Sequence, residues 1–296
     1  MSKTQKVLLA AFGAYIGIFI LLIAIYGFAQ HKNNEFQIQN EFKLVNWVNL
    51  GVFSINRAVL YLFISAALTV FTMVWIAGRM QARPNKIQTA VEVLFSLMRD
   101  NITRGNMSDS MAAKWFPFIG TLFLFIWFCN LVGYLPLPTN TEEKFNLFGA
   151  HIPSFALYAA TANISVPLVL ALVVFIAFIA VGIRTQGPIG YLKSLVPAGV
   201  HGPMLLLIFP IEVISTLMRL LSLTIRLWAN IFAGHIIIIF MAGGLAVILG
   251  LQAIGWFALP AGIAIYIFEL GLVATLQAFI FATLAAIYIG GSATHH

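Results

Sequence analysis

The sequence predicts an all-α integral membrane protein with five or six hydrophobic helices. Of its 296 residues, 61% are hydrophobic and only 8% are charged, whereas soluble domains are about 25% charged. The apolar runs are continuous, unlike the alternating strands of a membrane β-barrel. Several of these runs reach the length of about 20 residues that an α-helix needs to cross a bilayer. Together, these observations exclude a soluble enzyme domain.

Six apolar segments account for the predicted helices: 7–29, 58–78, 115–135, 155–183, 204–249 and 252–290. We expect residues 1–57 to contain an N-terminal span and an outside loop. We expect residues 58–296 to form a single membrane domain, because no internal repeat or soluble domain interrupts them.

The first segment has two interpretations. It is an apolar stretch of about 23 residues, which is longer than the usual apolar region of a signal peptide and favours a retained span. Lys3 and Lys6 before the stretch, with Gly27-Phe28-Ala29 after it, also fit a signal peptide with a cleavage site. Cleavage would leave five spans without changing the topology of the rest.

The distribution of Lys and Arg predicts the orientation. Six basic residues lie between the second and third segments, which places that loop in the cytoplasm by the positive-inside rule: Arg79, Arg83, Lys86, Arg99, Arg104 and Lys114. The loop 184–203 is then cytoplasmic, and the acidic loop 136–154 lies outside. The net charge of +7 reflects few acids rather than many bases, so we do not infer nucleic-acid binding.

Residues 85–102 predict a different kind of helix. Apolar residues recur at helical spacing, with Gln88, Glu92 and Arg99 between them. This pattern is typical of an amphipathic helix on a membrane surface, here the cytoplasmic one. A surface for docking a partner is the alternative interpretation.

The last two segments are too long for perpendicular spans. Segment 204–249 would extend roughly 69 Å as an α-helix and 252–290 nearly 60 Å, against a hydrocarbon core of about 30 Å. Neither segment has a polar turn near its middle. We therefore predict two long, strongly tilted helices that form a hairpin around a short glycine-containing turn.

The fifth segment carries a polar stripe. Six polar residues follow one another at spacings of 3, 4, 3, 4 and 4 residues and fall within about 40° of Arg226 around the helix: Glu212, Ser215, Arg219, Ser222, Arg226 and Asn230. Ionisable groups at membrane depth cost about 2.5–3.5 kcal/mol each and usually mark ion pathways. A buried ion pair of Arg226 with Glu212 or Glu269, and snorkelling of Arg219 to the interface, are the structural alternatives.

Three further polar residues lie within the last two segments. His235 follows Arg226 by nine residues, about 180° around the helix, and therefore belongs to a different environment. Glu269 and Gln277 lie in the final segment. Hydrogen bonding between helices is the structural alternative for Asn230 and Gln277, and a satisfied polar group is the alternative for His235.

The stretch SLTIRLWANIFAGH (222–235) resembles the arginine motif of subunit a of F-type ATP synthases, the membrane stator that faces the rotating c-ring. Other stretches are also similar to this family: QTAVEVLFSLMRDNI (88–102), NLVGYLPLP (130–138), TANISVPLVLAL (161–172) and LQAFIFATLAAIYIG (276–290). The resemblance covers about residues 58–290. It implies two nearly horizontal helices against the c-ring, a peripheral stalk of b-type subunits as a second partner, and a bacterial plasma membrane or an organellar energy-coupling membrane.

The resemblance also implies roles for the polar residues. Arg226 matches the essential arginine, which keeps the passing c-ring carboxylate ionised and prevents protons from crossing directly between two half-channels. Glu212, Ser215 and Ser222 would belong to the cytoplasmic half-channel, and Arg219 is a further candidate residue of the proton pathway. Asn230, His235, Glu269 and Gln277 would belong to the outer one, while Ala233 and Gly234 would permit close approach to the ring.

Two positions depart from the family pattern. Leu220 stands where many relatives have proline. Glu269 precedes Gln277 by eight residues, where we expect an acid or a histidine seven residues before. Eight α-helical residues rotate the side chain by about 80°, and seven by only about −20°. Glu269 therefore faces differently, or the helix is locally overwound or bulged.

On this interpretation the chain translocates protons and performs no bond chemistry itself. We expect no cofactor and no metal, because no phosphate-binding loop or ligand cluster is present. A secondary transporter or ion channel is the alternative function, and it would favour inverted repeats and broken helices. A subunit of a respiratory complex is a further alternative, although a haem version would need paired axial ligands.

Overall fold

The computed structural model describes residues 3–26, 42, 44, 46–50, 53–79, 85–147, 150–195, 204–244, 246–247 and 252–293. The described chain divides into two compact units. One comprises Met1–Lys43 with Ala233–Gly271, and the other Leu44–Phe232 with Leu272–His296. Each unit is treated separately below.

The predicted all-α membrane class is confirmed. Five described helices are long and apolar enough to cross a membrane, and α1 (Lys3–Tyr26) contributes a shorter apolar stretch at Phe12–Ile25. In the larger unit, the long apolar helices are α2 (Arg57–Arg79), α4 (Asp109–Gly133), α5 (Ser165–Gln186) and α10 (Ala274–Ala293), together with most of α7 (Met204–Ile239). Large apolar side chains of α2 such as Phe63, Phe71 and Val74 are exposed, as expected of surfaces that contact lipid.

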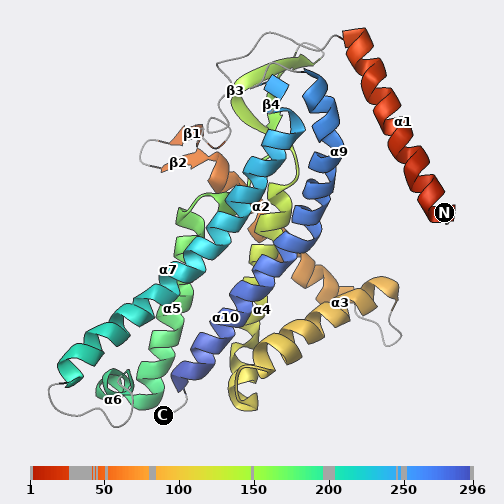
Figure 1. Ribbon diagram of the computed structural model, residues 1–296. Helices are drawn as coiled ribbons and strands as arrows, with labels where there is room; N and C mark the ends of the chain where they lie inside the picture. Colours follow the sequence, from red (N-terminus) through yellow and green to blue (C-terminus); the bar gives the residue numbers. More distant parts are fainter. Residues whose placement is uncertain are drawn as a thin grey trace. The chain divides into compact units, whose positions relative to one another are not determined.

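Helix α4 lies at the centre of the larger unit. It packs against α2 and α10, and α10 also packs against α5 (Figure 1). Small residues let α10 approach its neighbours closely, because one side of this helix is lined by Ala274, Ala278, Ala282, Ala285 and Ala286, all buried. Small residues at helix interfaces are typical of membrane proteins, since they allow close contact between backbones.

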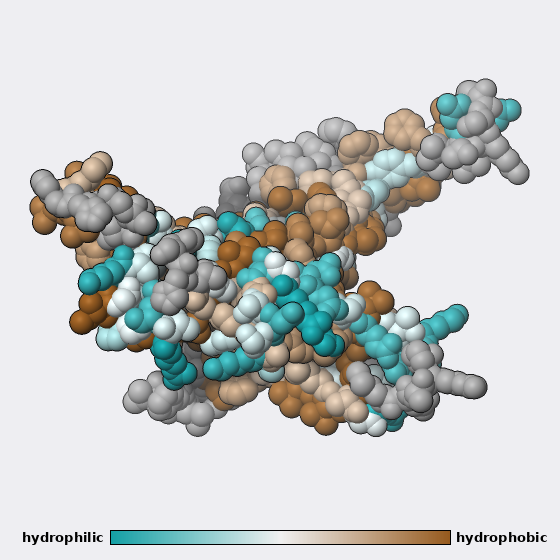
Figure 2. All heavy atoms as spheres, turned by 90° about the horizontal axis from the view of Figure 1, so that it is seen from below, coloured by the Kyte–Doolittle hydropathy of each residue, from teal (hydrophilic) through white to brown (hydrophobic). Residues whose placement is uncertain are grey.

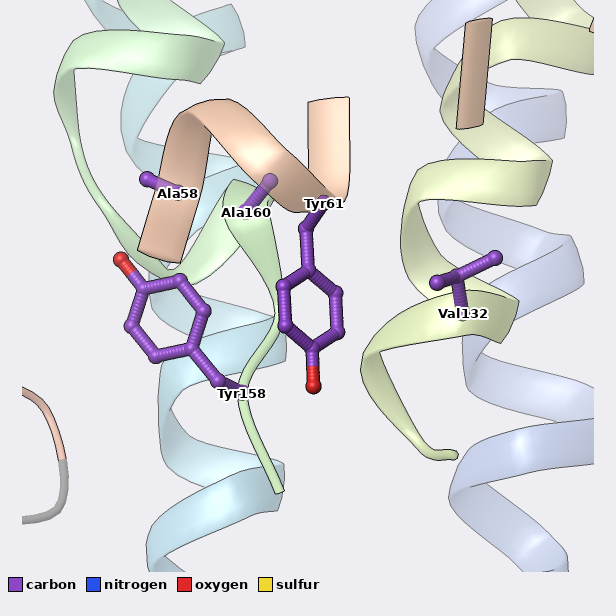
Figure 3. Packing of buried hydrophobic residues seen from close by; sticks show 5 residues of the cluster. All are labelled: Ala58, Tyr61, Val132, Tyr158 and Ala160. Atoms are coloured by element: carbon purple, nitrogen blue, oxygen red, sulfur yellow. The ribbon is translucent and has the colours of Figure 1, made fainter. Parts of the chain in front are cut away.

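A buried cluster joins one end of α2 to α4 and to the 3₁₀ turn η3 (Ala160–Ala162). The rings of Tyr61 and Tyr158 meet edge to face at 5.7 Å between centroids (Figure 3). The guanidinium carbon of Arg57, a buried residue, lies 4.6 Å from the centre of the Tyr158 ring. Burial raises the pKa of the Tyr158 phenol, although the Arg57 charge partly opposes this.

The predicted amphipathic helix at 85–102 is present as α3 (Lys86–Ser96) followed by a π-helical segment, η2 (Leu97–Arg104). The side chain of Asn85 caps the start of α3 by accepting a hydrogen bond from the Gln88 backbone nitrogen at 2.9 Å. Met98 and Ile102 are buried, while Glu92 and Arg99 are exposed.

Figure 2 shows one face of the molecule coloured by hydropathy. Hydrophilic side chains gather in patches on this face, and apolar side chains cover much of the rest of it.

Both predicted outside loops contain a β-hairpin that we did not predict. Strands β1 (Asn46–Leu50) and β2 (Phe53–Asn56) pair antiparallel, as do β3 (Leu137–Leu147) and β4 (Ala150–Ala156). The predicted start of the fourth span at 155 was therefore wrong. Helix α5 begins only at Ser165, whose backbone nitrogen donates to the Asn163 side chain at 3.1 Å.

The two predicted long helices are also present. Helix α7 has 36 residues and continues into a π turn, η4 (Phe240–Gly244). A further helical stretch of 39 residues covers Gly255–Ala293. It comprises most of α9 (Gln252–Phe268), a π turn, η5 (Glu269–Val273), and α10. In the smaller unit α1 packs against α9, and α9 packs against η4. A short helix, α6 (Pro188–Ser194), follows α5.

Candidate functional site

The polar stripe of α7 lies on the face that the chain leaves uncovered. Five of its members are exposed and Glu212 is partly exposed: Ser215, Arg219, Ser222, Arg226 and Asn230. A neighbouring face, roughly 60–140° around the helix from Arg226, is buried through Leu223, Leu227 and Ile231. The indole nitrogen of Trp228 donates to the Ala162 carbonyl at 3.0 Å and so anchors α7 to η3.

Arg226 therefore presents its charge away from the packed face. Its Nη2 donates to the Ser222 hydroxyl oxygen, one turn earlier, at 3.4 Å. No ion pair of Arg226 occurs among the residues that the structure describes. The alternative of a buried ion pair that binds helices together is not supported, because Arg226 is exposed.

Arg219 has a different environment from Arg226. Its guanidinium carbon lies 5.5 Å from the centre of the Tyr288 ring of α10. Burial raises the pKa of the nearby Tyr191 phenol, and the charge of Arg219 partly offsets this rise. Arg219 thus lies close to two aromatic side chains, Tyr288 and Tyr191.

In the smaller unit, Glu269 lies against the helix that carries His235. A Cβ atom added to Gly234 would collide with the Glu269 carboxylate. Gly234 is buried, and His235 is 1% exposed. The missing side chain of Gly234 thus makes room for Glu269, while the expectation that Gly234 allows approach to the ring stays a prediction. Ala233 is exposed.

The π turn η5 explains the unusual spacing of Glu269 and Gln277. A π turn contains one residue more than an α turn. The eight-residue spacing therefore advances the helix by about the angle that seven α-helical residues would, close to −20°. The predicted bulge is present, and overwinding is excluded because π turns are wider than α turns. Gln277 is 5% exposed.

Three buried polar residues were not predicted from the sequence as site residues: Arg57, Asn130 and Thr161. Asn130 and Thr161 hydrogen bond to each other through Thr161 Oγ1 and Asn130 Oδ1 at 2.9 Å. A lone asparagine within the apolar segment 115–135 was the available signal for Asn130. Among the described residues, no group of three or more His, Cys, Asp or Glu residues is placed to hold a metal ion.

The long apolar helices define a multi-pass membrane protein, and α7 carries an exposed stripe of polar and charged residues. The sequence profile of the ATP synthase A chain family matches residues 59–290. The chain belongs to this family, the proton-translocating stator subunits of F-type ATP synthases.

Individual relatives agree with the family match. The ATP synthase subunit a of Rubrobacter xylanophilus is 35% identical over 80% of this chain and 83% of its own length. That of Gluconobacter oxydans is 34% identical over 81% of this chain and 89% of its own. The Pelagibacter ubique subunit is 31% identical over 90% of this chain and 99% of its own.

Proposed function

We propose that Arg226 faces the c-ring of the synthase and controls the protonation of the ring carboxylate. The observation that carries this proposal is the exposed polar stripe of α7 on an otherwise apolar helix. An arginine left facing acyl chains would cost about 2.5–3.5 kcal/mol. A partner that presents a carboxylate at this face removes that cost and gains a charge-assisted contact.

The chemistry follows from electrostatics. A positive charge within about 4–6 Å stabilises the ionised form of a carboxylate and lowers its pKa by 1–3 units. A ring carboxylate that reaches Arg226 therefore releases its proton, and it is reprotonated after moving on. The fixed charge also repels protons, so that it separates the two access paths.

We assign the remaining residues to these paths. Glu212, Ser215 and Ser222 serve the cytoplasmic path, with Arg219 positioned beside it. Asn230, His235, Glu269 and Gln277 serve the outer path. The position of Glu269 against Gly234 supports its assignment with His235, since both then belong to one region of the smaller unit.

The length of α7 supports a tilted arrangement. Its 36 residues extend about 54 Å, nearly twice the thickness of the hydrocarbon core. Such a helix, lying obliquely, follows the curved side of a ring over a long distance. A peripheral stalk of b-type subunits holds the stator against the ring, and the complex lies in a bacterial plasma membrane.

Cross-linking tests which face of α7 meets the ring. We expect a photoactivatable reagent on Ser222→Cys or Asn230→Cys to label c subunits in the assembled complex, because these positions are exposed. The matched controls Leu223→Cys and Leu227→Cys, which are buried, should not label them. Cys129→Ser provides the background, because Cys129 is the chain's one native cysteine. Equal labelling from both faces would contradict the proposal.

We further propose that α1 is retained as a span preceding the membrane domain 58–296. Its Tyr15 hydroxyl donates to the Phe257 carbonyl at 2.5 Å, and the rings of Phe19 and Phe257 lie 5.5 Å apart. These contacts tie α1 to α9 within the smaller unit, which a cleaved signal peptide would not need.

The intact mass of the purified subunit tests this proposal. We expect a mass that includes α1, and a short bifunctional reagent should join Phe19→Cys to Phe257→Cys. The control pair Leu9→Cys with Phe257→Cys should react poorly, since Leu9 lies almost three helical turns from Phe19 along α1. A mature N-terminus just after Ala29 would show that the segment is cleaved.

A further inference from the structure

Asn130 connects three elements in the interior of the larger unit. Its side-chain nitrogen donates to the Ala274 carbonyl at 3.2 Å, and its side-chain oxygen accepts from the Thr161 hydroxyl at 2.9 Å. Asn130, Thr161 and Ala274 are all fully buried. The asparagine is therefore a bridge between η3 and the beginning of α10.

A second bond from α4 reaches the same turn of α10. The indole nitrogen of Trp127, one turn before Asn130, donates to the Thr275 hydroxyl oxygen at 3.0 Å. Two consecutive residues of α10, Ala274 and Thr275, are thus held by two residues on one face of α4. These bonds fix both the depth and the rotation of the helix at this point.

The position of this contact is significant because η5 ends at Val273. A π turn interrupts the regular bonding of an α-helix and is frequently found at functional sites. A carbonyl oxygen has two lone pairs, so Ala274 accepts the Asn130 amide in addition to any bond within its own helix. The Asn130 contact therefore holds the first residue after the irregular turn.

We propose that Asn130 is a positioning residue that fixes the rotation of α10 and, through it, the direction of Gln277. Gln277 lies three residues beyond Ala274, on the same side of the helix. Thr161 orients the Asn130 amide so that its nitrogen, rather than its oxygen, faces Ala274. The inference rests on the proposed function in one respect, namely that Gln277 belongs to the outer proton path.

This role differs from that of a residue that only lines a water-filled path. A lining residue needs a polar group, whereas the positioning role needs a donor toward Ala274 and an acceptor toward Thr161. Asn130→Asp retains the acceptor but lacks the donor. Thr161→Val removes the hydroxyl without altering Asn130, and Thr161→Ser retains it.

Alkylation of a cysteine reports the direction of position 277. In the Cys129→Ser background, Gln277→Cys should react slowly with a maleimide in the assembled complex, because this position is 5% exposed. Adding Asn130→Leu or Thr161→Val should increase the rate roughly threefold to tenfold, the size expected for loss of a buried hydrogen bond between membrane helices. Adding Thr161→Ser should leave the rate unchanged. Leu276→Cys, already exposed, is the matched control and should show no increase.

ATP-driven proton pumping, measured with Gln277 intact, separates this inference from the proposed function. We expect Asn130→Leu and Thr161→Val to lower pumping by a similar factor, with Thr161→Ser close to the native level. Faster alkylation with unchanged pumping would support the positioning role and contradict the assignment of Gln277 to the proton path. Unchanged alkylation in both Asn130→Leu and Thr161→Val would overturn the positioning role. If Asn130→Leu fails to assemble, the Thr161 pair decides the result alone.

Discussion

Replacement of Arg226 by alanine is expected to lower ATP-driven proton pumping strongly while the complex remains assembled. Arg226 is exposed and makes no ion pair among the described residues, so its removal should not weaken the fold. Without its charge, the ring carboxylate loses a pKa shift of about 1–3 units. We therefore expect pumping in membrane vesicles to fall by about 10- to 1,000-fold, which corresponds to this shift.

Arg219→Ala provides the matched control. It removes an exposed arginine two turns earlier on the same stripe, but one that lies over the Tyr288 ring. We expect pumping to fall less than about threefold, consistent with the modest energy of an exposed cation–π contact. A rise in the passive proton leak of Arg226→Ala alone would identify Arg226 as the barrier between the two paths. Normal pumping by Arg226→Ala would refute the central proposal.

Deletion of one residue within α10 is expected to prevent assembly of the subunit. Removing Ile280 would rotate the remainder of the helix by about 100°. Thr283 and Ile287 would then occupy the positions of the buried residues Ala282 and Ala286, in the interface with α4 and α5. The amount of subunit a that copurifies with the complex measures this loss.

Deletion of Gly271 is the informative comparison. Gly271 lies within η5 and is exposed. Its removal would convert the π turn to a regular α turn and so preserve the rotation of both flanking helices. We expect assembly to be largely retained, with Glu269 and Gln277 at the seven-residue spacing. Equal failure of the two deletions would show that the π turn does not act as a one-residue insertion.

The sequence was most informative where periodicity and burial coincide. The spacing of Ser215, Ser222, Arg226 and Asn230 predicted one polar face on α7, and the structure places all four on the exposed side. The lengths of the last two helices followed from unbroken apolar runs. The eight-residue spacing before Gln277 predicted a bulge as one of its explanations, and η5 is that bulge.

Periodic sequence patterns could not predict the long-range contacts. Asn130 and Ala274 are separated by 144 residues, and no local periodicity links them. The two hairpins were missed because loop composition was interpreted as polarity alone. The contact of Gly234 with Glu269 was not foreseen, because a glycine indicates that something approaches closely without indicating which group it is.

The uncovered stripe of α7 also bears on how the cell makes this protein. An orphan copy in the bilayer would expose Arg219 and Arg226 to lipid, with no other chain to shield them. Such a copy is unfavourable in the membrane, and we expect quality-control proteases to degrade it. We therefore expect the lifetime of this subunit to depend on the supply of c subunits. Degradation of the excess would then keep the amount of this subunit in proportion to the c subunits.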